Sequence, residues 1–362
     1  MLTVWPRVWG YILSRLSRFV FGMAVLLGLA CTGACRSAPP TSATHLHTFE
    51  GMTMGTTYTV RTVTGRPWNL SERERIGTLI QSTLDEIEAK MSHYDTNSEL
   101  SRFNRIQGAA PFTVSADTFE VVRLAQEISV LTGGALDITV GPLVNAWGFG
   151  PSEPVQLPPD PGQLARLEAR VGYDQLTLDP VLLTLTKKTP GLECDLSAVA
   201  KGYGVDRVAD VLAEVGVTRF MVEVGGEISA VGLNQQDRPW RIGIERPTAE
   251  GGIETVVPLR NHAMATSGDY RNTREIEGQL VSHTIDPRTG RPVDHQLASV
   301  SVISEHCAVA DGLATALEVL GPEQGYALAV RQGWAALFLV RLDDGTVAAR
   351  TTPAFDRIIS ES

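Results

Sequence analysis

The stretch from 195 to 206 is the sequence feature that most constrains the fold. Its sequence is Asp-Leu-Ser-Ala-Val-Ala-Lys-Gly-Tyr-Gly-Val-Asp; it follows a β-rich segment at 176–187 and begins a helical pattern that runs to about Val215. Asp195, at this strand-to-helix junction, can cap the helix and lies beside its positive end. Lys201 lies one turn further, where its ammonium group can meet a phosphate. The stretch therefore predicts an anion-binding helix N-terminus, although a capped helix with an exposed lysine would have the same pattern.

A second pattern, Asp311-Gly-Leu-Ala-Thr315, indicates a metal site within a helix expected at 307–320. Residues four apart lie on one face of a helix, so the carboxylate and the hydroxyl point at the same place. Both are hard oxygen donors of the kind that magnesium and calcium bind. Two such groups cannot hold an ion alone, so backbone carbonyls and substrate phosphates would complete its shell. The alternative is a helix-terminal aspartate with a threonine bonded to the backbone.

The segment 282–290, Ser-His-Thr-Ile-Asp-Pro-Arg-Thr-Gly, contains an Asp-Pro-x-x-Gly turn. We expect this turn to fix a strand at 282–285, which would present His283 from a rigid element. A neutral histidine can accept a proton from a hydroxyl, so His283 is a candidate general base. A surface histidine beside a turn is the alternative.

Other segments suit the walls of a pocket. The small polar stretches Gly-Gly-Glu (225–227) and Thr-Ser-Gly-Asp-Tyr (266–270) follow strand patterns. They would line a pocket with backbone, or form two tight turns. Met54 and Tyr94 could flank a planar ring, or be core residues.

The pattern of elements predicts an α+β fold. Strands and helices do not alternate regularly, and neither a G-x-G-x-x-G motif nor a P-loop is present, which excludes a Rossmann unit and a P-loop nucleotide site. Besides the helix after Asp195, helices are expected at 70–91, after 92–100, at 115–132, 162–171 and 307–320, and strands within 49–64 and at 176–178, 182–187, 220–224, 228–233, 240–245, 253–259, 262–266, 282–285, 298–303 and 334–342.

The first 35 residues are expected to be an export leader. Three arginines precede an apolar run at 19–30, which is too short for a comfortable membrane span. Small residues before Cys31, and again before Cys35, are similar to a bacterial lipobox, in which the cysteine becomes lipidated. Cys31 fits better because the apolar run leads straight into it; a plain signal peptide is the alternative. Residues 36–48 would then be a flexible tether.

Composition and net charge restrict the classes of partner that the chain can have. The chain has 362 residues and a net charge of −10, which argues against nucleic acid as the main partner. Two cysteines remain after the leader, Cys194 and Cys307, and their apolar surroundings favour buried free thiols over a disulfide.

A colinear series of motifs resembles the ApbE family, the magnesium-dependent FAD:protein FMN transferases. The resemblance runs from about Gly51 to Leu342, nearly all of the chain after the leader. The motifs are Met-Gly-Thr-Thr-Tyr (54–58), Tyr-Asp (94–95) with Ser-Glu-Leu (98–100), Gly-Ala-Leu-Asp-Ile-Thr-Val-Gly-Pro-Leu-Val (134–144), Trp-Gly-Phe-Gly (147–150), Asp-Leu-Ser-Ala-Val-Ala-Lys-Gly-Tyr (195–203), Val-Gly-Gly-Glu (224–227), Thr-Ser-Gly-Asp-Tyr (266–270), His-Thr-Ile-Asp-Pro-Arg-Thr-Gly (283–290) and Ala-Asp-Gly-Leu-Ala-Thr-Ala (310–316).

The resemblance implies a two-lobed, T-fold-like mixed sheet with helices over 49–350, FAD between the lobes, and a C-terminal tail at 351–362. Magnesium would be held by the carbonyl of Ala198 with Asp311 and Thr315. Leu136 departs from the family, in which an aromatic residue is frequent at this position. The implied FAD contacts are Met54, Tyr94, Ala135, Leu136, Asp137, Asp195, Lys201 and Ile285.

The implied activity is the transfer of FMN from FAD to a Thr or Ser hydroxyl of an acceptor flavoprotein, with release of AMP. His283 would take the hydroxyl proton and Lys201 would add positive charge at the phosphates. The family's acceptors are subunits of membrane redox complexes and exported reductases, and its members are lipid-anchored on the periplasmic side of the bacterial inner membrane. A magnesium-dependent FAD pyrophosphatase that yields FMN and AMP, and a non-catalytic FAD-binding lipoprotein, are the alternatives.

Overall fold

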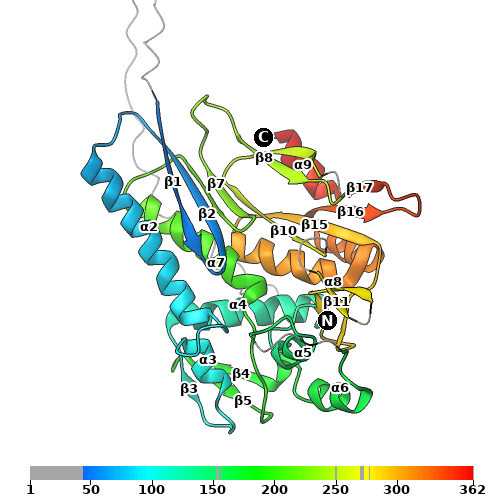
Figure 1. Ribbon diagram of the computed structural model, residues 1–362. Coiled ribbons are helices and arrows are strands. Elements are labelled where there is room, and N and C mark those ends of the chain that lie inside the picture. The colour runs from blue at the N-terminus through cyan, green and yellow to red at the C-terminus, as the bar shows by residue number, and fades with distance from the viewer. Residues whose placement is uncertain are drawn as a thin grey trace, which may run out of the picture. The chain divides into compact units, whose positions relative to one another are not determined.

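The fold is built on one eight-stranded antiparallel sheet (Figure 1). Its strands have the order β1-β2-β6-β7-β10-β15-β16-β17, and helices and further strands cover it. The computed structural model describes residues 44–151, 155, 157–248, 251–269, 273–276 and 278–361. The expected leader with Cys31 and Cys35, residues 36–43 of the expected tether, and Tyr270 lie outside these residues. The tether expected at 36–48 is wrong from His45 onward, because β1 begins there and pairs with β2. The strands of the sheet are β1 His45–Thr53, β2 Thr56–Thr64, β6 Phe220–Val224, β7 Glu227–Val231, β10 His262–Gly268, β15 Leu297–Ser304, β16 Ala335–Arg341 and β17 Val347–Thr351.

Helices cover one face of this sheet. They are α2 Leu70–Met91, α4 Ala116–Thr132, α7 Ser197–Glu214 and α8 Cys307–Gln332, which bends at Gly321 (φ 76°) beside Pro322. Their apolar stripes are buried with the sheet: Ile80 and Leu84 of α2 share one core cluster with Val208 of α7. The strand β15 is buried along nearly its whole length, because it has cover on both faces.

The opposite face packs against the hairpin of β8 (Trp240–Glu245) and β9 (Ile253–Leu259) and against α9 (Pro353–Glu361). In β8, buried and exposed side chains alternate, as expected for a strand with one solvated face. Every second residue of β8 therefore joins the second core cluster, which also contains Phe355 of α9.

A smaller part lies beside this layered body, at the bottom of Figure 1. Its sheet has the order β3-β5-β4. Its elements are α3 Glu99–Asn104, β3 Phe112–Thr113, α5 Gly141–Ala146, α6 Pro161–Glu168, the 3-10 turn Tyr173–Gln175, β4 Leu176–Asp179 and β5 Thr184–Lys187. Two hairpins form separate small sheets: β11 Thr273–Ile276 with β12 Gln279–Ser282, and β13 Ile285–Asp286 with β14 Arg291–Pro292.

The expected α+β class is confirmed, and so are the burial and free state of Cys194 and Cys307. The strand expected at 282–285 is wrong: His283 and Thr284 form a bend between β12 and β13. The reason is a local hydrogen bond, in which the Thr284 N–H donates to Ser282 Oγ (3.1 Å) and competes with strand pairing.

The expected C-terminal tail at 351–362 is largely the helix α9 instead. The Thr352 hydroxyl donates to the Trp334 carbonyl (2.8 Å) and accepts from the Phe355 N–H (3.3 Å), so it ties the helix start to β16. Ala354 and Phe355 are buried on that strand. The sequence pattern of this segment was too short to reveal a helix that tertiary packing stabilises.

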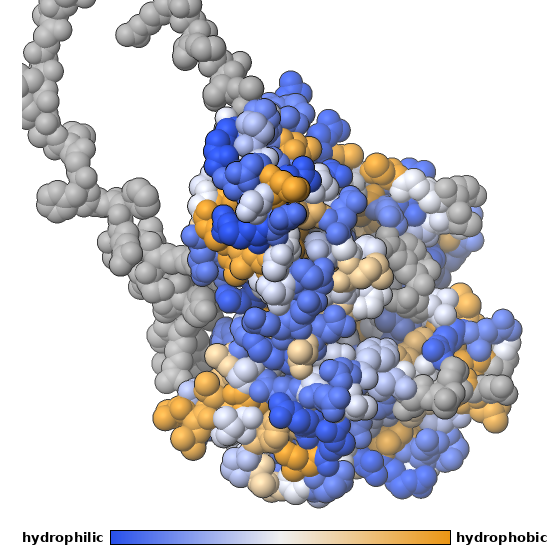
Figure 2. All heavy atoms as spheres, turned by 60° about the vertical axis from the view of Figure 1, so that its left-hand side comes forward, coloured by the Kyte–Doolittle hydropathy of each residue, from blue (hydrophilic) through white to orange (hydrophobic). Residues whose placement is uncertain are grey.

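On the side shown in Figure 2, apolar residues occur in small groups among polar ones. Within the described part of the chain, no helix combines the length and the apolarity that a membrane crossing needs.

Candidate active site

One cavity of about 990 Å³ contains every residue that the sequence nominated. This volume lies at the upper end of the range of small-molecule and cofactor sites. Its walls come from the β1–β2 turn, the loop after α2, the segment before α5, the N-terminus of α7, the β6–β7 turn, β10 and α8. The nominated residues among its lining are Met54, Tyr94, Ala135, Leu136, Asp137, Asp195, Ala198, Lys201, His283, Ile285, Asp311 and Thr315.

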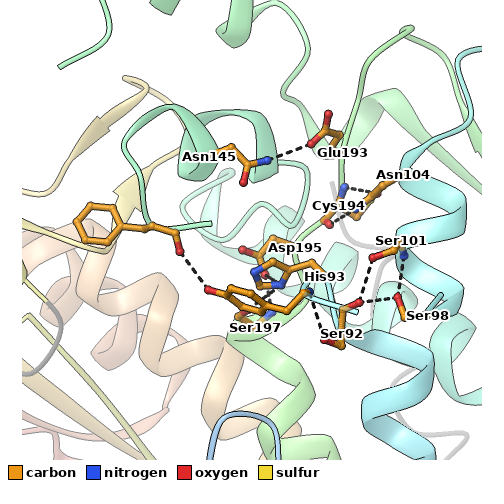
Figure 3. A network of polar contacts seen from close by, with 12 residues as sticks. Ser92, His93, Ser98, Ser101, Asn104, Asn145, Glu193, Cys194, Asp195 and Ser197 are labelled. Carbon is orange, nitrogen blue, oxygen red and sulfur yellow. Dashed lines mark hydrogen bonds and ion pairs between the residues drawn. The ribbon is translucent and has the colours of Figure 1, made fainter. Parts of the chain in front are cut away.

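The start of α7 is held rigidly. The Asn104 side chain brackets Cys194, since it accepts from the Cys194 N–H and donates to the Cys194 carbonyl, each at 2.8 Å (Figure 3). The next residue, Asp195, accepts from the Ser197 N–H through Oδ1 (2.9 Å). The helix N-terminus, with Ala198 in its first turn, therefore opens onto the cavity from a fixed position.

A buried ionic cluster lies one turn along α7. The ammonium group of Lys201 is 2.6 Å from Glu227 Oε1, and the Gly202 N–H donates to Asp311 Oδ2 (3.0 Å). Glu227 and Asp311 are only 2% and 3% exposed. Glu227 is the first residue of β7 and Asp311 comes from α8, so the cluster joins three elements.

Burial sets the electrostatics of this cluster. It raises the pKa of Glu227 to about 7, a rise that the charge of Lys201 limits. It also raises the pKa of Asp311, against the opposing effects of Lys201 and the Gly202 N–H. Burial alone would lower the pKa of Lys201, but the charges of Asp311 and Glu227 hold that pKa above its usual value. The lysine is therefore a permanent cation in a region short of positive charge.

The residues at this place fit a divalent cation. Thr315 lies one turn after Asp311 in α8, and its hydroxyl is 3.2 Å from Ser267 Oγ. Glu227 Oε2 is buried without a hydrogen-bond partner among the described residues, so a charged oxygen here lacks compensation. The donors are all hard oxygens, as magnesium prefers. No group of three or more His, Cys, Asp or Glu residues in the described ranges could hold a metal ion.

The β1–β2 turn brings Met54 to the cavity. Met54 has φ 48°, in the left-handed region that is uncommon for a residue with a side chain. Its N–H donates to Glu88 Oε2 of α2 (2.9 Å), which stabilises this conformation. A Cβ atom at Gly204 would come within 3.1 Å of Met54 Cε, so the glycine in α7 makes room for the methionine.

The segment Ala135–Asp137 is buried, and the carboxylate of Asp137 is occupied internally. It accepts from the Thr139 N–H (2.8 Å) and hydroxyl (2.7 Å) and from the Tyr173 N–H (2.7 Å). Burial raises the pKa of Asp137 in spite of these bonds. The side chain of Asp137 therefore fixes the loop, and it is the backbone of this loop that can contact a ligand. Leu136 packs close to Gly312 of α8.

The opposite wall contains His283 and Ile285. Ile285 is 5% exposed and packs with Trp147 in a small core cluster. The Trp147 indole N–H donates to the Gly290 carbonyl (2.8 Å), which anchors the turn that follows β13. The ring of His283 lies edge-on to Phe149, with ring centroids 6.4 Å apart.

Among the lining residues that the sequence did not nominate as site residues are Glu227, His93 and Arg274. Glu227 was noted only as the end of a Gly-Gly-Glu turn, and His93 was not noted separately. Arg274 lies on β11, a strand that the sequence pattern did not reveal; its guanidinium carbon is 5.6 Å from the centroid of the Phe149 ring. Among the described residues Arg274 has no carboxylate partner, and it lines the cavity. In the sequence, the feature that could have indicated Glu227 as a site residue was the tight β6–β7 turn before it.

Comparison with known proteins identifies the class. The ApbE family matches residues 54–338, and the chain belongs to this family. It is 43% identical over 324 residues to an FAD:protein FMN transferase of Vibrio cholerae, with 89% of this chain and 94% of that protein covered. It is 40% identical to the FAD:protein FMN transferase of Haemophilus influenzae, with coverages of 96% and 99%.

The fold agrees with solved structures of the family. The flavin transferase ApbE from Vibrio cholerae has a TM-score of 0.79 at 41% identity and covers 87% of this chain and 99% of its own. The apo form of the flavinyl transferase ApbE of Pseudomonas stutzeri also has a TM-score of 0.79, at 37% identity, with coverages of 87% and 97%.

Proposed function

We propose that this chain is a magnesium-dependent FAD:protein FMN transferase. It would move FMN from FAD to a threonine or serine hydroxyl of an acceptor flavoprotein and release AMP. The observation that carries the proposal is the Lys201–Glu227–Asp311 cluster, which places a cation, a carboxylate and the helix end of α7 together in one large cavity. The relatives named FAD:protein FMN transferase match over most of both chains, which supports the same activity.

The transfer is a displacement at phosphorus. The acceptor hydroxyl oxygen forms a bond to the FMN-side phosphorus of FAD, and the bond from that phosphorus to the bridging oxygen breaks. AMP leaves with the bridging oxygen. The hydroxyl proton passes to a base, for which His283 is our candidate because it lines the cavity.

The hard oxygens of Asp311 and Thr315 on one face of α8 support a metal site there, with the carbonyl of Ala198 as a third ligand. A magnesium ion held there would neutralise charge on the pyrophosphate and on the leaving AMP. Lys201 remains charged throughout, because Glu227 and Asp311 hold its pKa high. It orients a phosphate oxygen and adds to the neutralisation, while Tyr94, Ile285 and Met54 offer apolar contacts to the rings of FAD.

The place of action is proposed from the first 35 residues. We expect lipidation at Cys31, an anchor to the inner membrane, and acceptors on the periplasmic side, in membrane redox complexes or exported reductases. Labelling cells with a radioactive fatty acid tests the anchor. Label should be lost with Cys31→Ser and kept with Cys35→Ser; label lost only with Cys35→Ser would move the anchor to that residue.

A mixed assay tests the activity. The full chain in detergent is incubated with FAD, magnesium and a candidate acceptor subunit, and the subunit is analysed by in-gel flavin fluorescence and mass spectrometry. The proposal predicts the mass of one FMN on the subunit and an equal amount of AMP, both lost with chelator. Free FMN and AMP with no labelled subunit would instead establish a pyrophosphatase. FAD recovered unchanged would establish a carrier.

A further inference from the structure

His93 lies in the cavity but has no role in the transfer as described above. It belongs to the loop that follows α2, and this loop is well fixed: Ser92 Oγ accepts from the N–H groups of Tyr94 (3.2 Å) and Asp95 (3.1 Å). The Ser101 hydroxyl donates to the Ser92 carbonyl (3.2 Å). The imidazole is therefore held in place by its own backbone and is 13% exposed.

One nitrogen of His93 faces the start of α7. Nδ1 is 3.4 Å from Asp195 Oδ1 and 3.5 Å from Ser197 Oγ, and Figure 3 shows the three side chains together. The same Asp195 oxygen accepts from the Ser197 N–H. Nδ1 therefore makes a hydrogen bond with Ser197 Oγ and a close polar contact with Asp195, so it links the two side chains at the start of α7.

The face of the ring contacts Tyr94. The two ring centroids are 4.2 Å apart and the planes are tilted by 39°. Tyr94 is 62% exposed, so the core does not hold it. Its hydroxyl donates to the Phe149 carbonyl at 3.2 Å. Burial, and next the charge of Asp195, raise the pKa of Tyr94, which shows that the two side chains are electrostatically close.

The other nitrogen of His93, Nε2, is buried and has no hydrogen-bond partner among the described residues. A buried ring nitrogen without a partner costs free energy. The chain nevertheless has a histidine here, although the contact with Tyr94 needs only a ring. The interaction that requires an imidazole is the one with Asp195.

We propose that His93 is a positioning residue that holds Asp195 and Tyr94 as one substrate-binding unit. It acts on Asp195 through the polar contact of Nδ1 and on Tyr94 through its ring. This inference rests on the proposed function, since it takes FAD as the substrate that both residues contact. His93 itself takes no part in the displacement at phosphorus.

The two interactions can be separated by substitution. His93→Phe keeps a ring against Tyr94 and removes the polar contact with Asp195. His93→Gln keeps an amide N–H for Asp195 and removes the ring. Each variant therefore tests one half of the proposal, and a difference between them is not expected from a residue that only fills space.

Double-mutant cycles on FAD affinity measure the coupling. Binding of FAD to the full chain is followed by quenching of flavin fluorescence. We expect His93→Phe to raise the Kd about tenfold, as for a lost polar contact with a charged group, and to add little more when Asp195 is already changed to Asn. His93→Gln should instead be non-additive with Tyr94→Leu and near-additive with Asp195→Asn.

Separate titrations with the two halves of FAD show which half depends on the unit of His93, Asp195 and Tyr94. FMN and AMP are titrated separately, and the half whose affinity falls in His93→Phe is the half that Asp195 contacts. His262→Gln, on β10 outside the cavity lining, is the matched control and should bind FAD like the wild type. Thermal unfolding of each variant shows whether it is folded.

The outcomes separate the positioning role of His93 from the proposed function of the chain. Additive effects in both cycles, or an unchanged Kd in folded His93 variants, would overturn the positioning role. An unchanged Kd with a fall in the maximal transfer rate would also overturn it, and would place His93 in the chemistry. A wild-type chain that binds no FAD would overturn the proposed function, and this inference with it.

Discussion

At the scale of single residues, the cavity combines many carboxylates with few cations. The described lining includes Asp137, Asp195, Glu227 and Asp311, while Lys201 is already paired with Glu227. An anionic substrate such as FAD must therefore find positive charge elsewhere in the site. Magnesium would supply part of it, and the N-terminus of α7 would add a fixed partial charge.

Arg274 is expected to supply another part of the positive charge that FAD needs. Arg274→Gln should weaken FAD binding about tenfold and reduce its dependence on salt, because one charge contact to a phosphate is lost. Binding of riboflavin, which has no phosphate, should not change. Fluorescence titrations at two salt concentrations measure both ligands, with Arg246→Gln, paired with Glu254 on the β8–β9 hairpin, as the control. Equal loss of FAD and riboflavin affinity would show that Arg274 acts by packing.

Glu318 on α8 should control the pH dependence of stability. It is fully buried, and neither carboxylate oxygen has a partner among the described residues. Burial, and next the charge of Asp269, raise its pKa well above the ordinary value. The folded state thus binds this proton more tightly than the unfolded state does. The stability that protonated Glu318 contributes is therefore complete below the pKa that the group has in the unfolded state. It is lost as the pH rises through the pKa of the folded state.

Glu318→Gln removes this titration. The free energy of unfolding at pH 8 should rise by about 1–3 kcal/mol, and the decline from pH 5 to pH 8 should become shallower. Urea unfolding at both pH values is the measurement. The exposed Glu323, two residues after the bend of α8, gives the matched control Glu323→Gln, which should behave like the wild type. An unchanged pH profile in Glu318→Gln would contradict the account.

At the scale of elements, the site depends on how closely α7 and α8 approach. A Cβ atom on Gly202 would lie 2.5 Å from the Cys307 carbonyl oxygen and 2.8 Å from Ala308 Cα. Asp206, one turn later, accepts from the N–H groups of Cys307 (2.8 Å) and Ala308 (3.0 Å), and so caps α8 from the neighbouring helix. These contacts place Asp311 beside Lys201.

Gly202→Ala should separate the two helices. We expect a loss of stability of about 1–3 kcal/mol from overpacking and a weaker response of FAD binding to magnesium, since Asp311 would move away from the Gly202 N–H. Gly77→Ala in α2 is the matched control, because its Cβ would meet Phe49 at an ordinary 3.4 Å. Thermal unfolding and FAD titration measure the two effects. Wild-type behaviour of a folded Gly202→Ala variant would refute this role of the helix contact.

Elements with strong local patterns were predictable, and those set by distant packing were not. The long helix α2 has buried residues at helical spacing, and Gly133 ends α4 in the left-handed conformation, as expected for a helix C-cap. The hairpin of β11 and β12 is short, and α9 depends on β16 for its burial. Their sequences alone do not distinguish them from loops.

At the scale of the whole molecule, the residues of the site could be nominated but not their arrangement. Met54, Asp195 and Asp311 stand in motifs, so the sequence indicated them, and the structure places them in one cavity. The order of the central sheet joins strands such as β2 and β6, which lie more than 150 residues apart. Such pairings are set by the global fold, and for this reason the ion pair of Lys201 with Glu227 could not be foreseen.

The most direct test of the account is a titration of FAD with and without magnesium. It is made on the wild-type chain, on Asp311→Asn, and on Asp356→Asn in α9 as the control. Binding sites that share the pyrophosphate must be coupled, so magnesium should tighten FAD binding and FAD should tighten magnesium binding by the same factor. We predict this coupling in the wild type and in Asp356→Asn, and its loss in Asp311→Asn. Affinity for FAD that is independent of magnesium in all three proteins would contradict the central claim.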